Sequence, residues 1–231
     1  MSKDRINGVM LGLFYIAAAV TSVIAVLFYQ PVLSGHWYTA AADGFKAKVL
    51  LGVVNELLLV VSAVGTAVML FPYVRRWNEH IALGYLCFRF MEAVFIAIGL
   101  VSILGLLHLS TEYQAGRLTD PAERDALGGL LQAVYRWTSV LGPNLMLGIN
   151  TTLYSYLLYR MRGIPRLQAV FGMVTAVMVF IAGLLELFGA VDSYSAVKGL
   201  LALPVGVYEM SLAVYFIGKG FRKQKALLLQ V

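Results

Sequence analysis

The sequence predicts an all-α fold: a polytopic membrane bundle of six transmembrane helices with the N- and C-termini in the cytoplasm. Apolar residues make up 60% of the chain and charged residues only 13%, against about 25% charged residues in a typical soluble domain. The apolar residues form runs that reach the roughly 20 residues a helix needs to cross a membrane. These runs are longer than the roughly 9–11 residues of a transmembrane strand and do not alternate. A β-barrel is therefore excluded.

The apolar runs fill most of the chain and leave only short polar intervals, so residues 1–231 form a single integral membrane domain. The first run follows Lys3-Asp4-Arg5. It exceeds the ~7–15 residue apolar core of a signal peptide, so we expect it to be retained as a span. The six expected spans cover residues 8–30, 47–72, 81–108, 137–159, 166–189 and 197–218.

An additional amphipathic helix is expected at residues 121–136, outside the membrane and directly before the fourth span. Asp120 is a candidate N-cap, and Pro121 suits the first turn of a helix. Leucine and valine side chains recur on one face of this segment, so we expect it to lie over the mouth of the bundle as a lid. Within the fourth span, Gly142-Pro143 predicts a kink.

The distribution of lysine and arginine predicts the orientation of the spans. With six spans both termini share one side of the membrane, and positively charged residues are enriched on the cytoplasmic side. The side of the termini carries Lys3, Arg5, Arg75, Arg76, Arg160, Arg162, Arg166, Lys219, Arg222, Lys223 and Lys225. The other side carries Lys46, Lys48, Arg117, Arg124, Arg136 and Lys198, together with most of the loop acids. We therefore place both termini in the cytoplasm.

Seven polar residues inside the expected spans are candidates for a binding site. Ionisable side chains at this depth cost at least ~2.5–3.5 kcal/mol each on insertion scales, so they face the bundle interior and have partners there. The candidates are Asn55, Glu56, Arg89, Glu92, Asn144, Asn150 and Glu209. At a rise of ~1.5 Å per residue, the three acids and the arginine fall within about two turns of the midplane. They are expected to meet at one level.

Arg89 and Glu92 are three residues apart, so they share a helix face and are expected to form an ion pair. Glu56 and Glu209 then have no obvious cation inside the membrane. One arginine does not balance three carboxylates in a low dielectric, so at least one acid is expected to be protonated near neutral pH. Glu186 lies near the outer boundary of its span, where its side chain is expected to reach water and to have a structural role.

Few other motifs point to chemistry. His36, His80 and His108 lie at helix ends or in loops, so paired haem ligation inside the bundle has no support, and no zinc-type spacing is present. Motifs of metalloproteases, serine hydrolases and phosphate-binding loops do not occur. No basic-aromatic array suggests nucleic acid. We therefore expect no cofactor and no metal, and membrane lipids as the surrounding partners.

Four stretches carry a resemblance to a known family. They are Asn55-Glu56-Leu-Leu-Leu-Val-Val, Leu83-Gly-Tyr-Leu-Cys-Phe-Arg-Phe-Met-Glu92, Leu141-Gly-Pro-Asn144 with Gly148-Ile-Asn150, and Leu203-Pro-Val-Gly-Val-Tyr-Glu209. In these the chain resembles the bacterial multi-pass membrane proteins of domain-of-unknown-function family 4386, from about Arg5 to Phe221. The resemblance implies a six-helix protein of the bacterial inner membrane. It implies no activity, so it assigns no role to any residue.

Three classes of function remain open. The first is binding or carrying a small lipophilic ligand between the helices, with its polar end at the Glu, Arg and Asn residues named above. The second is an intramembrane enzyme in which a protonated Glu56 or Glu209 acts as general acid on a lipid or isoprenoid. The third is a structural subunit whose polar residues only hold helices together. The sequence favours the first, and it leaves the ligand and the oligomeric state undetermined.

Overall fold

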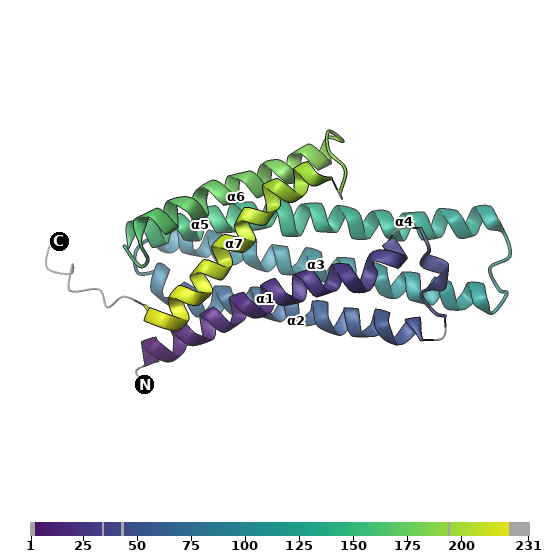
Figure 1. The fold of residues 1–231 in the computed structure, drawn as a ribbon, viewed down its shortest axis with the longest axis horizontal. Helices are drawn as coiled ribbons and strands as arrows, with labels where there is room; N and C mark the ends of the chain where they lie inside the picture. Colours follow the sequence, from purple (N-terminus) through teal and green to yellow (C-terminus); the bar gives the residue numbers. More distant parts are fainter. Residues whose placement is uncertain (1–2, 34, 43, 194, 222–231) are drawn as a thin grey trace, which may run out of the picture.

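The computed structural model describes residues 3–33, 35–42, 44–193 and 195–221, and these are helical apart from short turns (Figure 1). The elements are α1 (Lys3–Leu33), η1 (Trp37–Thr39), α2 (Phe45–Val74), α3 (Glu79–Gln114), α4 (Pro121–Ser139), η2 (Val140–Met146), α5 (Leu147–Arg160), α6 (Arg166–Leu187) and α7 (Ala196–Lys219). No strand occurs within the described ranges. The predicted all-α class is confirmed.

Five of these helices are long and apolar enough to cross a membrane, namely α1, α2, α3, α6 and α7. Their lipid-exposed faces carry large apolar side chains such as Leu51, Val101 and Leu203. Because backbone groups inside a membrane must bond within their own segment, helices are the form that such runs adopt. The chain is therefore a multi-pass membrane protein.

The fourth expected span, 137–159, lies in a helical run that has one change of winding. α4 continues into the π-helix η2, which contains Pro143, and η2 continues into α5; the junction residues Val140 and Leu147 both have right-handed helical backbone angles. α5 alone has 14 residues, a length of about 21 Å, whereas η2 and α5 together approach the roughly 30 Å of a hydrocarbon core. The irregular backbone falls where Gly142-Pro143 predicts it. The total of six spans remains a prediction.

α4 begins at the residue that the sequence predicts, but it does not lie over the mouth of the bundle. The Asp120 carboxylate accepts a hydrogen bond from the Ala122 amide at 2.9 Å and caps the helix. α4 then packs along α3 in line with η2 (Figure 1). Gln132 Nε2 donates to the Val32 carbonyl at 2.7 Å, which ties α4 to the end of α1. The expected lid across the bundle mouth is therefore wrong, because the apolar face of α4 is used to lengthen the bundle.

The helices form a closed arrangement in which α2 packs on α1 and α3, both α4 and α5 pack on α3, α6 packs on α5, and α7 packs on α6 and returns to α1. The start of α1 and the end of α7 lie at the same end of the bundle (Figure 1), where Gly8 contacts Gly220. We call this the terminal end and the other the far end. The placement of both termini in the cytoplasm remains a prediction. Arg222, Lys223 and Lys225 lie outside the described residues.

Candidate functional site

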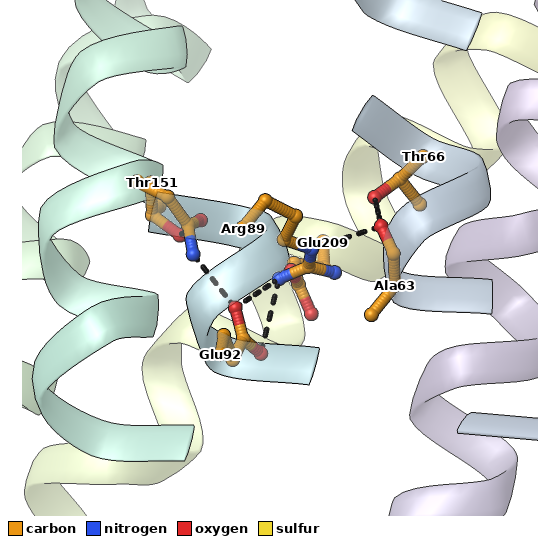
Figure 2. Close-up of polar contacts among 7 residues, drawn as sticks. Ala63, Thr66, Arg89, Glu92, Thr151 and Glu209 are labelled. Atoms are coloured by element: carbon orange, nitrogen blue, oxygen red, sulfur yellow. Dashed lines mark hydrogen bonds and ion pairs between the residues drawn. The ribbon is translucent and has the colours of Figure 1, made fainter. Parts of the chain in front are cut away.

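Arg89 lies at the centre of a buried polar network (Figure 2). Its side chain is 3% exposed. Nη1 donates to both carboxylate oxygens of Glu92, at 3.3 and 3.0 Å, as their spacing on α3 predicts. Nε donates to the carbonyl of Ala63 on α2 at 3.2 Å. Nη1 also lies 3.6 Å from Glu209 Oε1 on α7. One guanidinium thus connects three helices.

Glu92 receives a further donor from α5. Asn150 Nδ2 donates to Glu92 Oε2 at 2.6 Å, and the Thr151 hydroxyl lies 3.4 Å from Asn150 Oδ1 (Figure 2). Glu92 is therefore paired with a cation and hydrogen-bonded to an amide. We call Arg89, Glu92, Asn150 and Glu209 the Arg89 centre. All four were candidates from the sequence, and the structure brings them together.

Glu209 is the least satisfied member of the Arg89 centre. It is 8% exposed, and its Oε1 makes no hydrogen bond with any described residue. Its only charge contact within the described part of the chain is the 3.6 Å approach to Arg89, a guanidinium that already binds Glu92 at shorter distance. Two carboxylates share one cation, so the centre carries one excess negative charge when both are ionised.

Glu56 does not join the Arg89 centre. It lies on α2, and with ~1.5 Å per residue it is roughly 7 Å farther from the terminal end than Glu92 is. Its Oε1 accepts a hydrogen bond from the Tyr135 hydroxyl at 3.4 Å. The ring of Tyr29 packs edge-on against Tyr135 at 5.9 Å. The expectation that Glu56 meets Arg89 at one level is therefore wrong, because α2 places it more than one helical turn farther along the bundle.

Asn55 and Asn144 also lie apart from the Arg89 centre. Asn55 Nδ2 donates to the Thr21 carbonyl at 2.8 Å and so links α2 to α1. Asn144 Nδ2 donates to the Ser139 carbonyl at 3.0 Å within its own helical run, where the π-helix changes the backbone pairing. Both contacts stabilise the bundle, and neither brings the amide to Arg89.

Four buried tyrosines beside the Arg89 centre were missed from the sequence. Tyr15, Tyr85, Tyr154 and Tyr208 are at most 1% exposed. The ring of Tyr154 lies 6.4 Å from Tyr15, 5.3 Å from Tyr85 and 6.1 Å from Tyr208. Two of them could have been predicted from helical spacing. Tyr85 is four residues before Arg89 and Tyr154 is four residues after Asn150, so each shares a helix face with a member of the Arg89 centre. Tyr15 has no such neighbour on α1.

The hydroxyls of these tyrosines differ in their partners. Tyr208 accepts a hydrogen bond from the Ser155 hydroxyl at 2.9 Å. The hydroxyls of Tyr15, Tyr85 and Tyr154 make no hydrogen bond to any described residue. All four tyrosines lie within electrostatic range of Glu209. Four polar groups without a hydrogen bond, three hydroxyls and Glu209 Oε1, therefore occur in one buried region.

Glu186 forms a second charged cluster at the far end. Its side chain is 1% exposed and contacts Lys198 and Ser193, and Arg136 Nε lies 3.4 Å from its Oε1. The expectation that Glu186 reaches into water is wrong, because α4 and α7 bring cations to it. Its structural role agrees with this pairing, which ties α4, α6 and α7 together.

Two apolar grooves face the lipid beside the Arg89 centre. One lies between α2 and α3 and is lined by Val64, Ala67, Leu86, Cys87 and Phe90. The other lies between α5 and α6 and includes Gly148, Ile149 and Thr152. No carboxylate lines either groove. The Arg89 Nε–Ala63 hydrogen bond joins the two helices of the first groove, and Ala63 and Arg89 directly precede the groove residues Val64 and Phe90 in sequence. Among the described residues, no group of three His, Cys, Asp or Glu is placed to hold a metal ion.

Comparison with known families gives one result. The family model for a domain of unknown function, DUF4386, matches residues 10–220. The chain belongs to the DUF4386 family. The match includes every residue of the Arg89 centre and all four tyrosines, so these groups lie in the part that defines the family domain. No curated protein and no solved structure matches the chain.

Proposed function

We propose that this DUF4386 protein binds and carries a small lipophilic ligand whose polar end occupies the region between Glu209, Tyr15 and Tyr154. The observation that carries the proposal is the set of four buried polar groups without a hydrogen bond, the hydroxyls of Tyr15, Tyr85 and Tyr154 and Glu209 Oε1. Leaving one such group unpaired costs about 1–3 kcal/mol, and more for a charged group. A ligand that supplies donors and acceptors there would remove this cost.

The contrast with the other polar contacts supports a binding role over a purely structural one. Glu92 is held by Arg89 and Asn150, and Glu186 by two cations and a hydroxyl. Polar residues that only join helices are expected to be paired in this way. The side chain of Glu209 is 11% exposed, and the cation nearest to it among the described residues is Arg89 at 3.6 Å.

The lipid-facing groove between α2 and α3 offers a route for the apolar part of such a ligand. Its lining residues Val64 and Phe90 directly follow Ala63 and Arg89, which are hydrogen-bonded to each other across the same pair of helices. A separation of α2 and α3 at this level would join the groove to the polar region. The groove encloses about 300 Å³, the lower end of the volumes of small-molecule pockets.

Two irregular helices give the centre room to change shape, as carrying a ligand requires. Pro204 lies inside α7, about one and a half turns before Glu209, and the π-helix η2 precedes Asn150. A proline removes one helical hydrogen bond, and π-helices occur often at functional sites. The basic residues at the terminal end support placing that end in the cytoplasm, and the family resemblance supports the bacterial inner membrane.

Native mass spectrometry of the protein extracted from its own membranes tests the proposal. The parent should retain a small molecule, and Glu209→Gln should lose it while keeping the elution volume of a folded protein. Glu56→Gln is the matched control, since it removes a buried carboxylate outside the Arg89 centre, and it should retain the molecule. No retained molecule in the parent, or equal retention in all three, would contradict the proposal.

A further inference from the structure

The charges of the Arg89 centre restrict what its ligand can be. Arg89 is the only cation among its members, and its Nη1 binds Glu92, which in turn accepts a hydrogen bond from Asn150. Glu209 supplies a second carboxylate at 3.6 Å from the same guanidinium. Two ionised acids and one arginine leave an excess charge of minus one in a region of low dielectric, which is unfavourable. A proton or a cationic ligand would cancel it.

We propose that the ligand is a lipophilic cation, of the ammonium class, and that its binding at Glu209 displaces the proton which the empty site holds. This inference rests on the proposed function and names its ligand class. The exchange is balanced: the Glu209 O–H bond breaks, the proton leaves to solvent, and the bound cation takes over its positive charge. The net charge of the site is the same before and after.

An anionic ligand fits this site poorly. Arg89, the one cation of the centre, already binds Glu92 through Nη1 and the Ala63 carbonyl through Nε. An anionic ligand would also add negative charge to a centre that already has an excess. A proton alone balances the charge of Glu209, but it leaves the hydroxyls of Tyr15 and Tyr154 without partners.

The tyrosines next to Glu209 supply the chemistry that a cation needs. Aromatic faces attract cations through their quadrupole, and tyrosine is among the side chains that form cages around quaternary ammonium groups. The rings of Tyr15, Tyr85 and Tyr208 all pack on Tyr154. Hydroxyl oxygens can in addition accept hydrogen bonds from a primary or secondary ammonium. The Glu209 carboxylate and the cluster of tyrosine rings therefore lie in the same buried region.

The charged and titratable groups around Glu209 come from four helices. They are Tyr15 on α1, Tyr85, Arg89 and Glu92 on α3, Tyr154 on α5, and Tyr208 on α7 itself. α6 presents Gly172 to the ring of Tyr208, and its one acid, Glu186, lies at the far end. Among the residues that the structure describes, Arg89 is thus the one positively charged neighbour of Glu209.

Proton displacement makes binding depend on pH in a fixed direction. Where the empty site holds a proton, each bound cation releases one, so affinity for a permanently charged cation rises with pH. The expected slope approaches tenfold per pH unit and falls to zero once the proton is already lost. An uncharged or anionic ligand would show no such rise.

Tetraphenylphosphonium and tetraphenylborate, two ions of the same shape and opposite charge, provide the test. Calorimetry on the purified full-length protein in detergent, in two buffers with different ionisation enthalpies, measures both affinity and protons released. We expect the phosphonium ion to bind with release of close to one proton at low pH. We expect it to bind Glu209→Gln at least tenfold more weakly and Glu56→Gln normally. The proton count uses the parent alone, so the test does not depend on how well a variant folds.

The outcomes separate this inference from the proposed function. Binding of tetraphenylborate but not tetraphenylphosphonium, abolished by Glu209→Gln, would leave the ligand site standing and overturn the cationic ligand. Phosphonium binding without proton release would overturn the exchange. Binding of neither ion by the parent, together with a retained neutral lipid in mass spectrometry, would overturn the inference alone. Binding of neither ion and no retained molecule would overturn both.

Discussion

Arg89 Nη1 and Glu209 Oε1 lie 3.6 Å apart, which connects α3 to α7 through the interior of the bundle. The same guanidinium binds Glu92 and the Ala63 carbonyl, so it joins α2, α3 and α7 at one point. Removing it would leave two buried carboxylates without a cation. A buried charge that loses its partner is far more costly than an exposed one.

Arg89→Ala should therefore lower the free energy of unfolding by ~3–5 kcal/mol, the range found when a buried pair is broken. Arg89→Leu combined with Glu92→Leu should recover much of this loss, because it removes the stranded charge as well as its partner. Thermal unfolding in detergent, followed by circular dichroism, measures the difference. Arg117→Ala is the control: Arg117 is exposed and pairs with Glu112, so its loss should barely change Tm. An Arg89→Ala variant that unfolds like the parent would show that Arg89 is not needed.

Glu186 and Glu209 should respond in opposite ways to the same exchange. Glu186→Gln weakens the contacts with Lys198 and Arg136 and should lower the free energy of unfolding by roughly 1–3 kcal/mol. It should leave ligand retention unchanged, because it lies at the far end. Glu209→Gln should keep Tm near that of the parent and abolish retention. Parallel Tm and mass-spectrometry measurements check this, and a loss of ligand in Glu186→Gln would contradict separate roles.

Gly172 allows α6 to pack directly on the ring of Tyr208. A Cβ at position 172 would lie 2.1 Å from Tyr208 Cζ, so Gly172→Ala should displace the ring next to Glu209. We expect weaker ligand retention and a lower Tm. Gly206→Ala on α7 is the matched control, since nothing lies within 4 Å of its added Cβ. That change should be neutral or stabilise by about 0.4–1 kcal/mol. Equal effects of the two exchanges would contradict the packing argument.

Topology is tested by labelling single cysteines in intact cells. Cys87 is the only cysteine in the sequence, so Cys87→Ala gives a cysteine-free parent. Ala115→Cys and Ala190→Cys lie in far-end turns and should react with an impermeant maleimide from outside. Arg76→Cys, in the α2–α3 turn at the terminal end, should react only after permeabilisation. Labelling of Arg76→Cys in intact cells would reverse the predicted orientation.

Much of the fold was predictable because lipid imposes simple rules. Run length and apolar composition indicate α1, α2, α3, α6 and α7, and proline marks the irregular winding of η2. The position of α4 was not predictable, because an amphipathic face fits a lid and a bundle extension equally well. The two placements are distinguished only by the contacts of Gln132 with α1 and of Leu131 with α3.

The Arg89 centre was predictable in part. The Arg89–Glu92 pair follows from spacing on one helix, whereas the Asn150 contact depends on how α5 is rotated toward α3. Counting residues from the ends of each expected span assigns Glu56 to the same depth as the Arg89 centre, because it assumes that every span is centred in the membrane. In the structure, α2 places Glu56 more than one helical turn farther along the bundle. Tyr15 was missed because an isolated tyrosine in an apolar run carries no sign of what it faces.

The most direct test of the ligand site is an experimental structure of the protein purified from its own membranes without added ligand. The account predicts non-protein density larger than a water molecule within hydrogen-bond distance of Glu209 Oε1, bordered by the Tyr15 and Tyr154 hydroxyls. Side chains packed against one another there, or a single ordered water that satisfies all three groups, would contradict it and leave the Arg89 centre with a structural role.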